Sequence, residues 1–191
     1  LRGCFSFLLV ATPSRTDLGP YQQLEQEVVA LVKSINDRFG TPDWTPLVLV
    51  NENVTADLLA GIYRAADLCL VSSLQDGMNL VAKEFIACQT DERGVLLLSR
   101  FTGAAEEIDG ALLINPFNID GFAKWIRSAL DMPAEERRAR MRAMRDHLRE
   151  LFAERGKRAL PDCRLKQGGA ASVVQRVECQ ANRLVEQRHQ R

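Results

Sequence analysis

Residues 67–89 read Asp-Leu-Cys-Leu-Val-Ser-Ser-Leu-Gln-Asp-Gly-Met-Asn-Leu-Val-Ala-Lys-Glu-Phe-Ile-Ala-Cys-Gln. The run at 67–71 is short and almost wholly apolar, which is typical of a parallel strand buried on both faces. Residues 79–89 are expected to form a helix, and the polar stretch between the two contains Asp76-Gly77, a common turn dipeptide. A strand, a turn and a helix in succession indicate one unit of a parallel α/β fold.

The same alternation extends over residues 1–148. Further strands are expected at 5–10, 46–50, 94–98 and 111–114. Helices are expected at 21–39, from Thr55, at 103–108, at 119–130 and over 133–148. About five alternations predict a doubly wound parallel sheet, a Rossmann-like α/β fold, in one domain covering 1–148. The helix at 21–39 is expected to have one apolar face, made by Leu24, Val28, Leu31, Val32 and Ile35.

The remaining residues, 149–191, form a tail with a different character. Gly168-Gly169 interrupts the chain, and an apolar stripe predicts a helix over 172–189. A flexible or wrongly joined tail explains the composition equally well. At the other end, the chain opens inside an apolar strand, so we expect an N-terminally truncated fragment.

Composition excludes several functional classes. Lys+Arg and Asp+Glu are both 25 in 191 residues, so the net charge is zero and a general nucleic-acid binder is not expected. The five cysteines contain no Cys-x-x-Cys pair, and His147 and His189 have no ligand cluster around them, so neither a metal nor a cofactor is expected. No apolar run approaches the ~20 residues of a membrane helix. Free cysteines in apolar runs favour a cytoplasmic protein.

The turn after residues 67–71 is the candidate ligand site, because ligands of doubly wound sheets bind outside the carboxyl ends of the strands. Gly77 is expected to allow a tight turn and a close approach of the backbone to a ligand. The amides that open the next helix can hold a diphosphate. Asp76 and Glu84 can accept hydrogen bonds from sugar hydroxyls. An ordinary turn and a solvated helix charge are the alternative, which these residues alone leave open.

Several motifs resemble those of trehalose-6-phosphate synthases, in the family's order and spacing. One is Asp-Gly-Met-Asn-Leu-Val-Ala-Lys-Glu-Phe at 76–85. The others are Gly-Thr-Pro-Asp-Trp-Thr-Pro at 40–46, Tyr-Arg-Ala-Ala-Asp at 63–67, Gly-Val-Leu-Leu-Leu-Ser-Arg-Phe-Thr-Gly-Ala-Ala-Glu-Glu at 94–107, and Ala-Leu-Leu-Ile-Asn-Pro-Phe at 111–117. The resemblance covers Phe5 to about Leu148. It implies the C-terminal, donor-binding half of a GT-B glycosyltransferase.

The resemblance also assigns roles to single residues. It implies that Asp76 contacts the donor glucose as the catalytic residue, and that Glu84 holds the ribose. It implies that the backbone of Val54 reads the nucleobase, with Leu59 packed nearby, and that Arg15 meets the phosphate of the acceptor sugar. The remaining donor contacts are implied for the backbone amides of Gly77, Met78, Asn79 and Leu80.

The implied reaction moves glucose from UDP-glucose, or another nucleoside diphosphate glucose, to glucose 6-phosphate with retention and without a metal. A homo-oligomer is left open. The family's anion clamp lies upstream of Leu1 and its acceptor domain is separate, so we expect the fragment alone to transfer no glucose. Two alternatives remain: a glucosylglycerol-phosphate synthase, and a non-catalytic regulatory subunit that binds nucleotide sugars.

Overall fold

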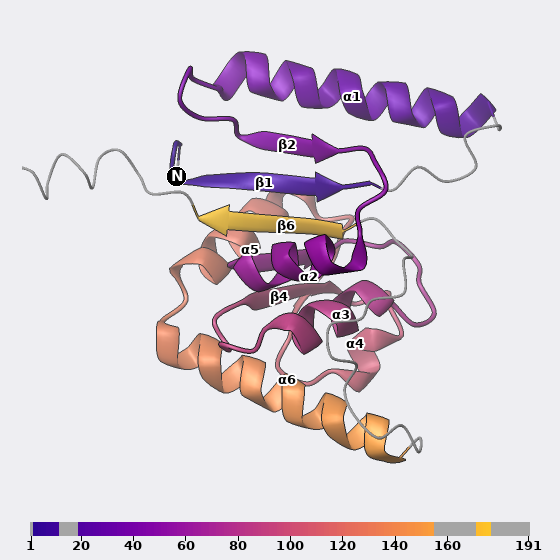
Figure 1. Ribbon diagram of the computed structural model, residues 1–191, viewed down its shortest axis with the longest axis vertical. Helices are drawn as coiled ribbons and strands as arrows, with labels where there is room; N and C mark the ends of the chain where they lie inside the picture. The colour runs from indigo at the N-terminus through magenta and orange to yellow at the C-terminus, as the bar shows by residue number, and fades with distance from the viewer. Residues whose placement is uncertain (1, 12–18, 155–170, 177–191) are drawn as a thin grey trace, which may run out of the picture.

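The five strands expected from the sequence run parallel to one another in a six-stranded sheet (Figure 1). The computed structural model describes residues 2–11, 19–154 and 171–176. The sheet order is β2-β1-β6-β3-β4-β5. Its strands are β1 (Phe5–Val10), β2 (Leu47–Val50), β3 (Leu68–Val71), β4 (Val95–Ser99), β5 (Leu112–Ile114) and β6 (Ala171–Arg176).

Helices follow the strands as the sequence predicts, with ends shifted by a few residues. They are α1 (Gly19–Phe39), α2 (Ala56–Ala65), α3 (Leu80–Cys88), α4 (Ala104–Glu107), α5 (Ile119–Asp131) and α6 (Ala134–Glu154). Asparagine or threonine side chains cap the first turns of three of them, at Thr55, Asn79 and Asn118. These caps satisfy amides that have no partner inside the helix.

The sheet has a core on each face, so the doubly wound class is confirmed. On one face α2, α3 and α6 pack against alternate residues of β3 and β4, including Cys69 and Leu96. On the other face α5 packs against the intervening residues, including Leu68 and Leu97. β3 and β4 are buried along their whole length. The turn after β3 therefore starts from the rigid centre of the molecule.

Helix α1 is less buried than its apolar stripe predicts. Leu24 and Leu31 are 57% and 61% exposed, whereas Val28, Val32 and Ile35 are partly buried. The reason is visible in Figure 1, where α1 lies beside the edge strand β2. A helix beside a sheet edge can bury only a narrow strip, so Leu24 and Leu31 of this apolar face stay exposed.

The secondary structure of the tail differs from the one that the sequence predicts. Residues 171–176, most of which the sequence places in a helix over 172–189, form the strand β6. β6 lies between β1 and β3 and pairs antiparallel with both. Val173, which is 1% exposed, pairs with Leu8 and Cys69. The rest of the expected helix lies outside the described residues. Hydrogen bonding to two distant strands outweighed the local helical pattern.

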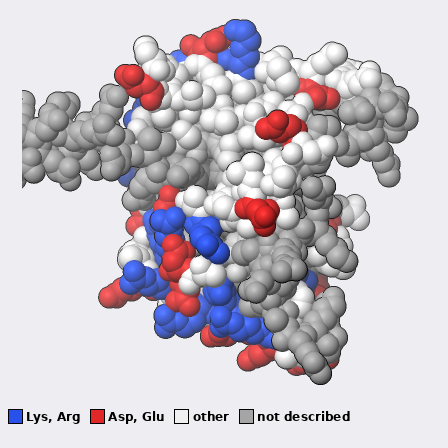
Figure 2. Space-filling view, in the orientation of Figure 1, with Lys and Arg blue, Asp and Glu red and all other residues white. Residues whose placement is uncertain are grey.

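The surface charges gather mainly along α6, as Figure 2 shows over the lower part of the molecule. Exposed arginines of α6 form ion pairs such as Arg140–Glu136 and Arg142–Glu92, both at 2.8 Å. Arg145 differs because it is buried and donates to the carbonyls of Ile86 and Ala87. The alternation of arginines and acids over 137–149 predicts a solvated helix face, and this prediction is wrong for Arg145. Within the part of the chain that the structure describes, no helix is long and apolar enough to cross a membrane.

We predict that Val173→Ala lowers the free energy of unfolding by about 2 kcal/mol, because it removes buried methyl groups at the joint between β1 and β3. Val48→Ala on the edge strand β2, where the side chain is 38% exposed, is the matched control. Its expected cost is within about 0.5 kcal/mol. Urea denaturation of both variants measures the difference, and equal small effects would contradict the central position of β6.

Candidate functional site

The turn between β3 and α3 is organised around the carboxylate of Asp76. Its Oδ1 accepts hydrogen bonds from the backbone amides of Met78 at 3.1 Å and Asn79 at 2.9 Å. Its Oδ2 accepts from Nδ2 of Asn79 at 2.9 Å. Partial burial raises the pKa of Asp76, but these three hydrogen bonds outweigh that effect and hold the pKa below its usual value. Asp76 is therefore an ionised carboxylate that shapes its own loop.

Asn79 reverses the direction of the chain in this turn and caps α3. Its backbone is left-handed, with φ at 52°, and its side chain is only 5% exposed. The side-chain oxygen caps α3 by accepting from the amide of Ala82 at 2.9 Å. Gly77 is not in the left-handed region, so the left-handed residue of the tight turn is Asn79. Asparagine adopts this conformation more readily than most side chains.

The four amides of residues 77–80 divide into two pairs. Those of Met78 and Asn79 donate to Asp76 and are engaged within the protein. Those of Gly77 and Leu80 donate to no acceptor among the described residues. Gly77 also has open space where a side chain would stand, since no atom lies within 4 Å of an added Cβ. The turn thus presents free amides and a bare backbone to its surroundings.

Glu84 differs from Asp76 in having no hydrogen-bond or ion-pair partner in the described part of the chain. It lies on α3 and is only partly exposed. Burial raises the pKa of its carboxyl to about 7. A half-buried carboxyl without a partner is costly, because its charged form is poorly solvated. Hydroxyl donors of a ligand would supply the missing partners.

Helix α2, which follows β2, contacts α3. Val54 is 5% exposed and belongs to the same core cluster as Val81 of α3, and Leu59 packs against that cluster. Tyr63 of α2 is fully buried, and its pKa is raised by burial and by nearby charges that include Glu84. Because β2 and β3 run in the same direction, the segments that follow them leave from the same edge of the sheet.

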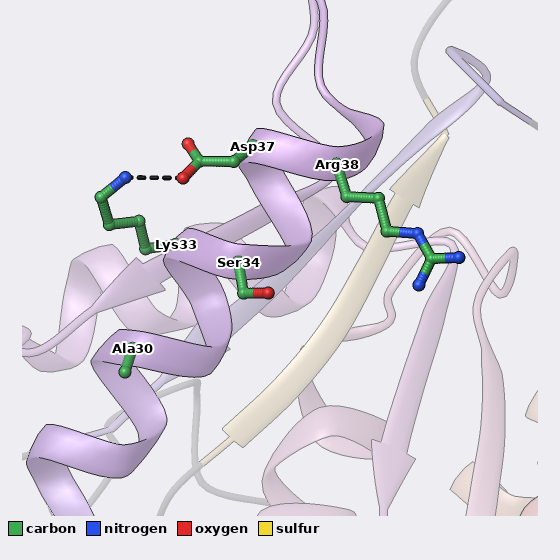
Figure 3. Close-up of a pocket in the computed structure, with 5 residues that line it drawn as sticks. All are labelled: Ala30, Lys33, Ser34, Asp37 and Arg38. Carbon is green, nitrogen blue, oxygen red and sulfur yellow. Dashed lines mark hydrogen bonds and ion pairs between the residues drawn. The ribbon is translucent and has the colours of Figure 1, made fainter.

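The remaining candidate features do not belong to this turn. Arg15, the predicted acceptor contact, lies outside the described residues. Among those residues, no three His, Cys, Asp or Glu side chains gather as they would to hold a metal ion. A surface hollow follows the outside of α1 and is lined by Ala30, Lys33, Ser34, Asp37 and Arg38 (Figure 3). All five come from one helix, and Lys33 and Asp37 already pair at 2.6 Å, so this hollow is not the site.

A second segment, which follows β4, holds the turn, and sequence reasoning missed it. Asp76 pairs with Thr102 in a parallel β-bridge, and the amide of Gly103 donates to the carbonyl of Asp76 at 2.8 Å. Lys83 of α3 forms an ion pair with Glu107 of α4. These residues fall in a motif that carries the resemblance, but nothing in their local pattern shows that they contact residues 76–83.

Two known proteins to which this chain is similar are named as trehalose-phosphate synthases. The chain is 46% identical over 128 residues to an alpha,alpha-trehalose-phosphate synthase [UDP-forming] of Candida albicans, covering 67% of this chain and 27% of that protein. It is 43% identical over 150 residues to a trehalose-6-phosphate synthase of Sinorhizobium fredii, covering 78% of this chain and 32% of that protein. The chain therefore spans about a third or less of these relatives.

Solved structures agree with the sequence matches. The UDP-forming synthase of Burkholderia xenovorans, in complex with glucose-6-phosphate, superposes with a TM-score of 0.75 at 44% identity, covering 81% of this chain and 35% of that one. The E. coli protein bound with UDP-2-fluoro glucose gives 0.69 at 39% identity, covering 78% of this chain and 35% of that one. These likenesses confirm that the fold is that of one domain of a GT-B glycosyltransferase.

The match to a protein family extends over most of the chain. The model of Glycosyltransferase family 20 matches residues 1–153, which include every described helix and strand except β6 and the last residue of α6. This span contains the Asp76 turn, Glu84 and the segment at 101–107. The chain belongs to glycosyltransferase family 20.

Proposed function

We propose that this chain is the donor-binding domain of a UDP-forming trehalose-phosphate synthase. The observation that carries the proposal is the partly buried Glu84 carboxyl, which has no partner in the described chain and lies on the helix that follows the Asp76 turn. Two adjacent ribose hydroxyls are the kind of donors that fit one carboxylate. The open amides of Gly77 and Leu80 are separate donors on the same turn.

The donor diphosphate is assigned to the turn and the start of α3. Backbone amides and the positive end of a helix stabilise phosphate groups, and α3 begins at Leu80. The bare backbone at Gly77 gives a ligand room to approach closely. A relative with UDP-2-fluoro glucose bound supports a uridine nucleotide as the donor.

Asp76 is proposed to contact the transferred glucose. A carboxylate has about four acceptor positions, and three of them are taken by Met78 and Asn79. One position remains for a sugar hydroxyl. In this arrangement Asp76 orients the glucose and carries its charge throughout, while the open amides stabilise the charge that develops on the leaving diphosphate.

Glucose 6-phosphate is proposed as the acceptor, since a relative has been solved in complex with it. The acceptor contact assigned to Arg15 lies outside the described residues and is part of this proposal. The glucosylglycerol-phosphate alternative shares the donor site and differs only in the acceptor. Titration of the chain with UDP-glucose by calorimetry tests the donor assignment, and absence of binding would contradict it.

We predict that Gly77→Ala folds as the wild type does but binds UDP-glucose at least about tenfold more weakly. The backbone at Gly77 needs no left-handed conformation, and an added methyl group meets no protein atom. It would instead occupy the space assigned to the donor. Thermal unfolding and calorimetry measure the two properties separately. Wild-type affinity in this variant would show that no ligand approaches Gly77.

We predict that UDP-glucose affinity depends on pH through Glu84. Because burial raises the pKa of the free carboxyl to about 7, the carboxyl holds its proton below that pH. Ribose hydroxyls donate to the ionised form, so binding releases the proton, and affinity rises about tenfold per pH unit before levelling off above pH 7. UDP-glucose suits this titration because both of its phosphates are esterified and release no proton in this range.

The Glu84→Gln variant should bind weakly with no such pH dependence, whereas Glu150→Gln, on the exposed side of α6, should behave as the wild type. Without nucleotide, the raised pKa makes the Glu84 contribution to stability greatest below pH 4.5, and it is lost as the pH rises through 7. Denaturant titrations should therefore show a smaller pH dependence for Glu84→Gln. If UDP-glucose affinity depended on pH in the same way in Glu84→Gln and in Glu150→Gln, Glu84 would not belong to the site.

A further inference from the structure

The segment that follows β4 lies against the Asp76 turn at residues 101–103. The carbonyl of Phe101 accepts from the amide of Asp76 at 3.4 Å, and the amide of Gly103 donates back to the carbonyl of Asp76 at 2.8 Å. Between these hydrogen bonds, Thr102 pairs with Asp76 as in a parallel sheet. The turn is thus bound to a second, independent piece of backbone that follows β4.

Gly103 is the point of closest approach between the two segments. Its own backbone is right-handed helical, with φ at −60° and ψ at −29°, so any residue can adopt it. A Cβ at this position would nevertheless stand 2.2 Å from the carbonyl oxygen of Gly77 and 3.0 Å from its carbon. Glycine is required here because the turn packs directly on it.

The group that this Cβ would displace is the peptide between Gly77 and Met78, since the Met78 nitrogen lies 3.7 Å from the same point. That peptide cannot move alone, because the Met78 amide is bonded to Asp76. A shift at Gly103 would therefore be transmitted to the whole turn. The Lys83–Glu107 ion pair provides a second connection, from the far end of α4 to the first turns of α3, and Lys83 is only 11% exposed.

We propose that Gly103 and Glu107 are positioning residues for the sugar-nucleotide site: they set how deep the 76–79 turn lies and so aim the open amides of Gly77 and Leu80 at the diphosphate. This inference rests on the proposed function. Neither residue touches the ligand. Gly103 acts by leaving room for the Gly77 carbonyl, and Glu107 acts by holding Lys83 and with it the start of α3.

The test compares two ligands, UDP-glucose and uridine, by calorimetry on the full chain. Uridine has the base and the ribose but no phosphate. A misplaced turn should therefore weaken the binding of UDP-glucose and leave the binding of uridine unchanged. We expect Gly103→Ala to lower UDP-glucose affinity about tenfold or more and to change uridine affinity little. Gly61→Ala is the matched control, because a Cβ there meets no atom within 4 Å, and it should leave both affinities unchanged.

Glu107→Gln adds no volume and weakens the ion pair with Lys83, so it tests the positioning role even if Gly103→Ala fails to fold. We expect it to lower UDP-glucose affinity several-fold relative to uridine. An unchanged ratio of the two affinities in the folded variants overturns the positioning role. Absence of UDP-glucose binding to the wild type overturns the proposed function instead, so the two failures are distinguishable.

Discussion

The site depends on one set of hydrogen bonds, the three that the carboxylate of Asp76 accepts from Met78 and Asn79. They tie the turn that follows the fully buried strand β3 to the start of α3. Asn79 completes the set by capping the helix and by taking the left-handed conformation that reverses the chain. Charge-assisted hydrogen bonds of this kind are stronger than neutral ones. The turn is consequently preorganised before any ligand arrives.

The two acids of this unit are in opposite physical states, which explains how similar residues serve different purposes. Asp76 has its partners within the protein and a lowered pKa. Glu84 has no hydrogen-bonding partner in the described chain, and burial raises its pKa to about 7. A satisfied carboxylate contributes to structure, whereas an unsatisfied one has capacity left for a ligand. The unsatisfied acid is therefore the better indicator of the binding surface.

The strand β6 bears on the site indirectly. It joins β1 and β2 to the rest of the sheet by antiparallel pairing on both sides. Because ligands of these folds bind beyond the carboxyl ends of the strands, the relative position of β2 and β3 sets the separation between the segments that follow them. Those segments carry Val54 and the Asp76 turn. A strand from the tail thus holds together the two parts of the sheet that the proposed site spans.

The sequence by itself determined the five parallel strands, the helices between them and the turn after β3, because apolar runs, helical periodicity and turn residues are local signals. It also singled out Asp76 and Glu84. Only the tertiary structure decided that residues 171–176 are a strand, that Asn79 rather than Gly77 is left-handed, and that Gly103 packs on the turn. The strand at 171–176 and the packing of Gly103 depend on contacts between distant segments, such as the 2.2 Å that an added Cβ on Gly103 would leave to the Gly77 carbonyl. No local pattern encodes such a distance, since it is set by how β3 and β4 lie side by side.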